Sequence, residues 1–155
     1  MQISVQDQAE NRRRILDFEA AMFRAKDDGD LQPVDFPLVH TFTEGNYARQ
    51  MTIPKGSVIV GKIHRHAHLN FVMRGHVMVM TDEGVREIVG PCYFVSTPGT
   101  KRIVTAVEET VWVTIHPTNE TDLAKIEADI IAPSFDDLQL PVAPGAPAQL
   151  EGVPA

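Results

Sequence analysis

Nine short segments rich in Val, Ile, Phe, Tyr and Thr follow one another between residues 38 and 116, with no helical pattern between them. They are LVHTF, YARQMTI, SVIVGKI, NFVM, HVMVMT, VREIV, YFVS, RIVTAV and TVWVTIH. β-Branched and aromatic residues favour strands, and turn signals such as EGN, PKG, DEG and TPGT separate these segments. Many short strands at near-regular spacing predict an all-β sandwich or barrel rather than alternating strands and helices.

The chain before this strand region is predicted to be helical. Residues 4–26 carry apolar side chains at helical spacing, and Gly29 follows as a stop signal. The apolar positions are Ile15, Phe18 and Met22. The segment DDGDLQPVDFP then breaks regular structure with Gly and Pro. We therefore expect an N-terminal helical extension outside the strands.

The chain after the strand region is predicted to form a second helix and an extended tail. The helix covers residues 122–131, with Thr121 as its N-cap and Pro133 ending it. The remainder is rich in Pro, Ala and Gly, which is typical of an extended segment. The predicted organisation is a helical extension, a β-barrel with a C-terminal helix, and a Pro/Ala-rich tail: residues 1–35, 36–132 and 133–155.

Charge and composition exclude several classes of partner. The formal net charge is −7, from 14 Lys and Arg against 21 Asp and Glu, which argues against nucleic acid because phosphate contacts need clustered basic side chains. The one basic run, residues 12–14, is predicted to be a solvated helix face. No apolar run approaches the roughly 20 residues that span a bilayer. Cys92 is the single cysteine, so the chain suits a reducing compartment.

Three histidines occupy alternate positions in GKIHRHAHLN, at His64, His66 and His68. Imidazole binds divalent metals, and a strand projects alternate residues to one face. His116 ends TVWVTIH with the parity of Trp112. We predict a metal site of His64, His68 and His116 with water in a fourth position, and Zn, Fe, Ni or Mn as candidate ions; His66 falls in a turn. The alternative is that the histidines form hydrogen bonds in the barrel without a metal.

Two segments resemble the paired motifs of the cupin superfamily, whose fold is a small jelly-roll barrel. GKIHRHAHLNFVMRG lies in the place of G-x5-H-x-H-x3,4-E-x6-G, and GPCYFVSTPGTKRIV in the place of G-x5-P-x-G-x2-H-x3-N. Residues 36–135 are similar to cupin-domain proteins encoded in tailed-phage genomes, through NYARQMTIPKGSVIVGKIH, PGTKR, TVWVTIHPTNETDLAKIE and IAPSF. The resemblance implies a cupin-like jelly-roll barrel.

The first motif departs from the family pattern at its carboxylate. Counting back from Gly75, the glutamate position falls at His68, and the paired histidines fall at Lys62 and His64. The other register places Asn70 at the glutamate position. Neither register supplies a carboxylate, so the family's three-histidine, one-glutamate site is not intact.

The second motif departs at Arg102, where metal-binding cupins have histidine. A guanidinium cannot bind a cation, but its planar donors suit a carboxylate or a phosphate. Arg102, Trp112 and His66 are therefore a candidate ligand pocket. The alternative is that Arg102 pairs with Glu108 or Glu109 at the rim of the barrel.

These departures favour a non-catalytic structural or binding module, and no catalytic residue is assigned. The phage resemblance implies a virion-associated protein, such as a capsid decoration or cement protein or a tail accessory protein, made in the host cytoplasm. Its terminal arms would dock on neighbouring subunits, with copies of itself and other virion proteins as partners, and neither nucleic acid nor membrane. The alternative is a metal-dependent cupin enzyme, a dioxygenase, isomerase or hydrolase acting on a small acidic molecule.

Overall fold

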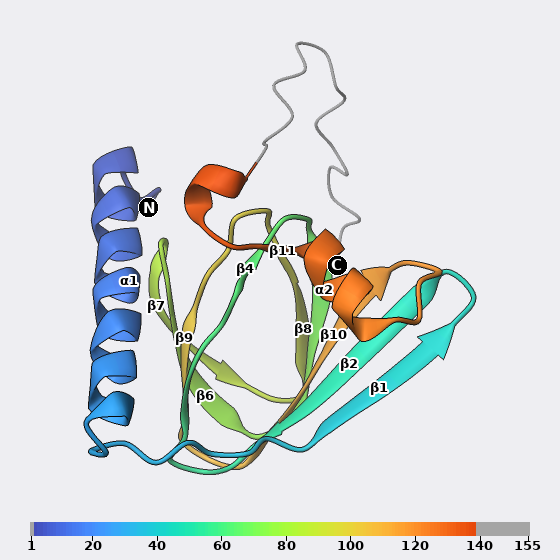
Figure 1. Ribbon diagram of the computed structural model, residues 1–155, viewed down its shortest axis with the longest axis horizontal. Coiled ribbons are helices and arrows are strands. Elements are labelled where there is room, and N and C mark those ends of the chain that lie inside the picture. The colour runs from blue at the N-terminus through green and yellow to red at the C-terminus, as the bar shows by residue number, and fades with distance from the viewer. Residues whose placement is uncertain (1, 139–155) are drawn as a thin grey trace.

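A computed structural model describes residues 2–138 of the chain (Figure 1). The helices are α1 (Val5–Asp27), α2 (Leu123–Ile130) and the 3-10 helix η1 (Phe135–Asp137). The strands are β1 (Leu38–Thr43), β2 (Asn46–Ile53), β3 (Val58–Val60), β4 (Ile63–His64), β5 (His68–Arg74), β6 (His76–Thr81), β7 (Gly84–Val89), β8 (Cys92–Ser96), β9 (Ile103–Ala106), β10 (Thr110–Pro117) and β11 (Ile131–Ala132). The first residues of the predicted tail, 133–138, include the 3-10 helix η1, and the part of the tail beyond residue 138 lies outside the described residues.

Two antiparallel sheets form the body of the protein. One has the order β1-β2-β10-β5-β8 and the other the order β3-β9-β6-β7, while β4 and β11 form a separate ribbon. The pairs β2–β10, β3–β9, β5–β8 and β6–β7 are those of one long hairpin with its turn between β6 and β7, wrapped so that successive pairs alternate between the sheets. This is the arrangement of a jelly roll, as the sequence led us to expect.

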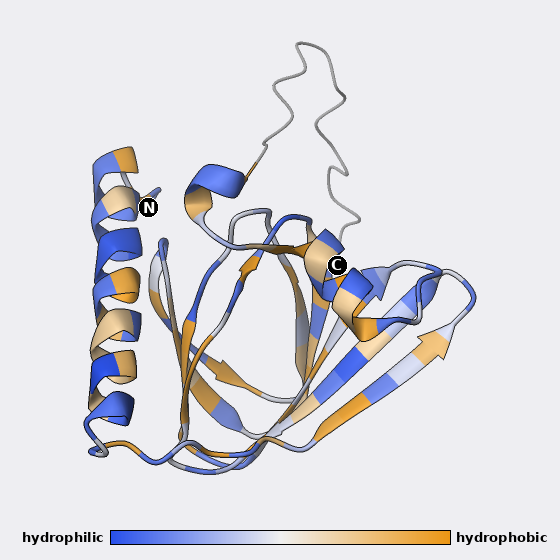
Figure 2. Ribbon diagram, viewed as in Figure 1, coloured by the Kyte–Doolittle hydropathy of each residue, from blue (hydrophilic) through white to orange (hydrophobic). Residues whose placement is uncertain are grey.

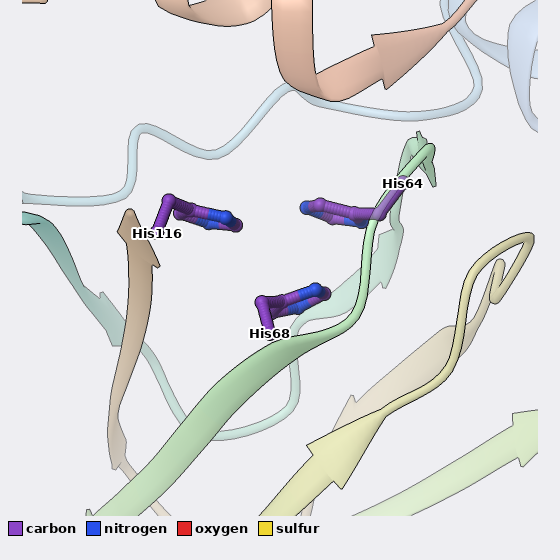
Figure 3. Close-up of side chains that lie close together, drawn as sticks. All are labelled: His64, His68 and His116. Carbon is purple, nitrogen blue, oxygen red and sulfur yellow. The ribbon is translucent and has the colours of Figure 1, made fainter. Parts of the chain in front are cut away.

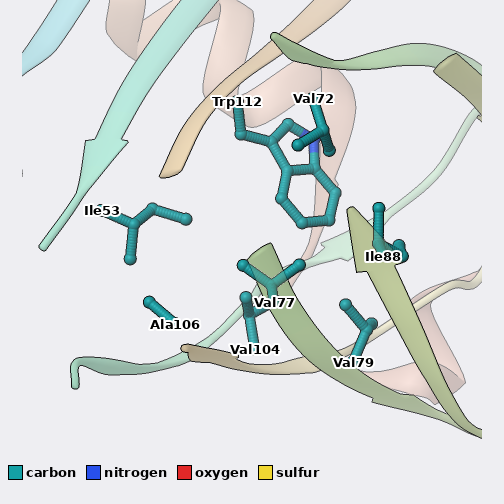
Figure 4. Packing of buried hydrophobic residues seen from close by; sticks show 8 residues of the cluster. All are labelled: Ile53, Val72, Val77, Val79, Ile88, Val104, Ala106 and Trp112. Atoms are coloured by element: carbon teal, nitrogen blue, oxygen red, sulfur yellow. The ribbon is translucent and has the colours of Figure 1, made fainter. Parts of the chain in front are cut away.

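The space between the two sheets is filled by apolar side chains of both (Figure 4). The cluster consists of Ile53, Val72, Val77, Val79, Ile88, Val104, Ala106 and Trp112. Hydrophobic and hydrophilic residues alternate along several strands (Figure 2), because successive side chains of a strand point to opposite faces. On β5, for example, His68, Asn70 and Val72 are buried, whereas Leu69 and Met73 are exposed. The inner face of β5 therefore carries both core and polar residues.

The turn between β5 and β6 requires a glycine. Gly75 has a φ of +105°, in the left-handed region that only glycine adopts readily. A Cβ atom there would also collide with Thr110 on β10. This turn therefore ends β5 and starts β6.

Two local predictions at the ends of the strand region need correction. The segment SVIVGKI, predicted as one strand, is divided into β3, which pairs with β9, and β4, which pairs with β11. The N-cap of α2 is Asp122 rather than Thr121: its carboxylate accepts from the amides of Ala124 (3.0 Å) and Lys125 (3.1 Å). A carboxylate at the cap also interacts favourably with the positive end of the helix dipole.

Helix α1 contacts the barrel mainly through polar side chains. Ile15 is its one buried apolar residue, and Phe18, which shares the helical spacing, is 40% exposed. Asn11 Nδ2 donates to the Asp82 carbonyl (3.0 Å), and the Arg12 guanidinium pairs with the Asp82 carboxylate (2.9 Å). The solvated face predicted for the basic run is therefore wrong for Arg12. Within residues 2–138, neither α-helix is long and apolar enough to cross a membrane.

Candidate metal centre

His64, His68 and His116 lie together at the end of the barrel that β4 occupies (Figure 3). His68 begins β5, and His116 lies near the end of β10. The two strands are antiparallel neighbours, and their pair Leu69 and Ile115 lies directly next to the two histidines. His64 ends β4, which is held over the barrel by pairing with β11 through His64 and Ile131. Three segments of the chain thus bring three imidazoles to one place.

The spacing of the rings suits a small cation. The ring centroids are 4.3 Å apart for His64 and His68, 4.8 Å for His68 and His116, and 5.7 Å for His64 and His116. One nitrogen from each ring lies within 4.8 Å of the other two. Zinc–nitrogen bonds of about 2.0–2.1 Å in a tetrahedron put two nitrogens about 3.3 Å apart. Metal binding would therefore draw the farthest pair together by about 1.5 Å.

All three imidazoles are neutral at physiological pH. Burial lowers the pKa of His64 to about 3, and the neighbouring His68, His116 and Arg102 lower it further in that order. Burial also lowers the pKa of His116 to about 4, with His68 the next cause. The pKa of His68 is lowered, again mainly by burial. Neutral imidazole is the form that binds metals, so no proton has to be displaced first.

One buried ring nitrogen of the set lacks a hydrogen-bond partner among the described residues. His68 Nδ1 lies 3.3 Å from the His66 carbonyl, which fixes the ring, but the buried His68 Nε2 contacts no donor or acceptor among the described residues. Buried polar atoms are nearly always hydrogen-bonded, so an exception requires an explanation. A backbone carbonyl on one nitrogen and an open lone pair on the other is the arrangement of a metal-ligating histidine. The residues fit a metal ion.

No carboxylate joins the three histidines within residues 2–138. Asn70, which one register placed at the family's glutamate position, is fully buried two residues beyond His68. Its carboxamide oxygen accepts from Trp112 Nε1 (3.0 Å), and its nitrogen donates to Ser96 Oγ (2.8 Å). Asn70 therefore supports the inner wall of the barrel beside the histidines and is not available as a ligand.

Arg102 and His66, the other candidate residues, lie outside the histidine set. The Arg102 guanidinium donates to Ser96 Oγ and lies 5.6 Å from the centre of the Trp112 ring. It makes no ion pair with Glu108 or Glu109, so the predicted rim pairing is wrong. Burial lowers the pKa of Arg102 to about 10, and the guanidinium stays charged at neutral pH.

His66 is exposed on the bend between β4 and β5, so the structure does not bring it into a pocket with Arg102 and Trp112. Sequence reasoning missed three residues around the site: Asn70 as a buried hydrogen-bonding group, Ser96 as the partner of Arg102, and Arg86, whose guanidinium lies 4.8 Å from the centre of the Phe94 ring. The alternation of polar and apolar residues along β5 could have identified Asn70 as inward-facing. No sequence signal identifies Ser96 or Arg86, because their roles depend on how the two sheets face each other.

No family model matches the sequence, and no curated protein does. Solved structures do match it. A cupin-superfamily protein from Desulfitobacterium hafniense is 6% identical in sequence, and the match covers 57% of this chain and 83% of that protein (TM-score 0.47). An RmlC-like cupin from Shewanella frigidimarina is 18% identical, and the match covers 57% of this chain and 84% of that protein (TM-score 0.45). A cupin domain from Bordetella pertussis is 15% identical, and the match covers 57% of this chain and 98% of that domain (TM-score 0.46).

These neighbours are cupins with low identities and low TM-scores, and the jelly-roll arrangement of this chain follows from its own strand order. Nothing in the comparisons links the chain to tailed phages.

Proposed function

We propose that the protein binds one divalent metal ion through His64, His68 and His116 and acts as a metal-dependent enzyme on a small molecule. The observation that carries this proposal is the convergence of three neutral imidazoles, one with an unpartnered buried nitrogen. Three protein ligands leave a coordination position open, as in catalytic zinc sites. A bound ion supplies Lewis acidity or an activated water there.

The donor set narrows the choice of metal among the four candidate ions. All three ligands are imidazole nitrogens, which suit Zn, Fe and Ni, whereas Mn is favoured by carboxylate and carbonyl oxygens. A ligand set without a carboxylate therefore affects which metal the site prefers, but it does not argue against metal binding. Zn, Fe and Ni are the ions that we expect.

The metal proposal is tested by titrating metal-depleted protein with Zn²⁺ in a calorimeter and with Co²⁺ by visible absorption. We expect one ion per chain, and we expect His68→Ala to weaken Zn²⁺ binding more than about 100-fold, because it removes a ligand rather than a supporting contact. His66→Ala is the matched control, since His66 is two residues from both His64 and His68 yet exposed. Equal binding by wild type and His68→Ala, with one ion or none, would contradict the proposal.

A second candidate function, a non-catalytic module that assembles with copies of itself, is supported by the outer face of the five-stranded sheet. The exposed side chains there include Met73 on β5 and Tyr93 and Val95 on β8. Large exposed apolar patches mark sites of protein contact. The predicted docking of the tail on virion proteins involves residues beyond 138, which the structure does not describe, and it stays a prediction.

Sedimentation velocity tests this second function. We expect the full chain to be dimeric at micromolar concentration, and we expect Tyr93→Arg to make it monomeric, because a guanidinium would be buried without a partner at the centre of the interface. Val85→Arg is the control, since Val85 is equally exposed (both 66%) but lies on β7 of the other sheet. A monomeric wild-type chain would exclude assembly through this face.

A further inference from the structure

Two arginines converge on one aromatic ring beside the candidate metal centre. The Arg102 guanidinium lies 5.9 Å from the centre of the Phe94 ring, and that of Arg86 lies 4.8 Å from it. They border a cavity of about 80 Å³. Arg86 is on β7 and Phe94 on β8, the strands that end the two sheets, so the cavity lies where the sandwich is open at its side.

The positive charge in this cavity is not matched by an acid. Among residues 2–138, neither Arg86 nor Arg102 has a carboxylate oxygen within 4.0 Å. Asp82, which lines the same cavity, is already paired with Arg12 of α1 (2.9 Å). Glu83, the other acidic residue of the lining, is exposed in the turn between β6 and β7. A partly buried guanidinium without a counter-ion is unfavourable unless an anion neutralises it.

Ser96 holds Arg102 in place at the inner wall of this cavity. Ser96 Oγ accepts from Arg102 and from Asn70 Nδ2 (2.8 Å), and Ser96 is buried in the wall of the barrel. Ser96 is also the cross-strand partner of His68, so the arginine cavity and the histidines occupy neighbouring positions on the inner face of the same sheet. A molecule held by Arg102 would thus extend toward the open position of the proposed metal.

We propose that Arg102 and Arg86 bind the oxyanion group, a carboxylate or a phosphate, of the small molecule that this site takes. The planar fork of Arg102 holds two anion oxygens, Arg86 covers the mouth of the cavity, and Phe94 holds both guanidinium planes in place. The volume admits the acidic group of a ligand, and the rest of the molecule extends out of the cavity. The assignment names the substrate class of the proposed enzyme and rests on that function, but the anion itself binds without a metal.

The test measures the binding of succinate and of inorganic phosphate, separately, to metal-free protein by calorimetry in a chloride buffer. We expect at least one of them to bind, and whichever binds more tightly identifies the group. Arg102→Gln should weaken that binding about 10- to 100-fold, as expected for the loss of hydrogen bonds to a charged group. Arg86→Gln, an exposed position whose change leaves the core intact, should weaken it several-fold.

Arg74→Gln is the matched control, because Arg74 is exposed and paired with Glu109 on the rim (2.6 Å); its anion binding should equal that of wild type. Absence of binding for both anions, or equal binding by wild type and Arg86→Gln, would overturn the proposal. Zn²⁺ titration of the same variants separates this inference from the metal site. If the protein binds Zn²⁺ but neither anion, only the proposal for the arginine site is contradicted. If it binds an anion but not Zn²⁺, only the proposal for the metal site is contradicted.

Discussion

Lowering the pH from 7.5 to 4.5 is expected to reduce the free energy of unfolding of the metal-free protein by about 5 kcal/mol through His64 and His116 alone. Their pKa values are about 3 and about 4 in the folded protein, mainly because burial disfavours the imidazolium, against 6.5 for an unperturbed histidine. Below pH 6.5 the unfolded chain therefore binds protons that the folded protein does not, and stability falls as the pH falls. Between pH 6.5 and pH 4.5, each histidine lowers the free energy of unfolding by roughly 1.4 kcal/mol per pH unit.

A loss of this size is comparable to the stability of a marginally stable domain, at the low end of about 5–15 kcal/mol, so acid unfolding is expected as the pH approaches 4.5. The measurement is urea unfolding at several pH values in the presence of a chelator. The control is His64→Gln/His116→Gln, which keeps polar side chains in place and removes both titrating groups. Carboxylates contribute equally to both proteins, so the difference between the profiles isolates the histidines. If the stability of both proteins falls equally with pH, then His64 and His116 bind protons in the folded protein as readily as in the unfolded chain, which would contradict the prediction.

The strand pattern, and which side of each strand the three histidines occupy, could be predicted from the sequence because they depend on local rules. The nine predicted segments correspond to β1–β10 with one segment divided, since β-branched residues and turn signals act within a few positions. His64 and His68 could be selected by alternation, and His116 by its parity with Trp112. Whether these three carry a metal stays a prediction, but the structure places them together as the sequence suggested.

The interactions that sequence reasoning missed join residues far apart in the chain. The alternative of pairing Arg102 with Glu108 or Glu109, its nearest acids in the sequence, is wrong. Its guanidinium donates instead to Ser96 Oγ, a contact that depends on how the two sheets face each other. The pairing of Arg12 with Asp82 crosses 70 residues and depends on where α1 docks. A helix with one buried apolar residue gives no periodic signal of its docking face.

Helix α1 is fixed to the loop that carries Arg102 by a partly buried ion pair. Lys101 Nζ lies 3.0 Å from Glu19 Oε1 and donates to the Gly61 carbonyl (3.0 Å). The Lys101 side chain is 7% exposed and that of Glu19 is 27% exposed. Removing the carboxylate would leave a buried ammonium with one hydrogen bond.

Glu19→Ala is therefore expected to lower the free energy of unfolding by about 2–3 kcal/mol, less than the 3–5 kcal/mol typical of a fully buried pair because Glu19 is partly solvated. Chemical denaturation at pH 7.5 measures the effect. Glu10→Ala is the matched control on the same helix, since the Glu10–Arg14 pair is exposed and should contribute no more than about 0.5 kcal/mol. Alanine favours a helix at both positions, so propensity does not explain a difference.

The double variant Glu19→Leu/Lys101→Met distinguishes two causes of the instability: an unpaired buried charge on Lys101, and the loss of packing between α1 and the loop. Replacing both members of a buried pair with apolar side chains of similar volume is often neutral, so this variant should recover most of the stability that Glu19→Ala loses. Because Lys101 precedes Arg102, Glu19→Ala should also weaken anion binding, whereas the double variant should retain it. Equal unfolding free energies for Glu19→Ala and Glu10→Ala would mean that the ammonium finds water when Glu19 is absent, and that α1 does not hold the Arg102 loop in place.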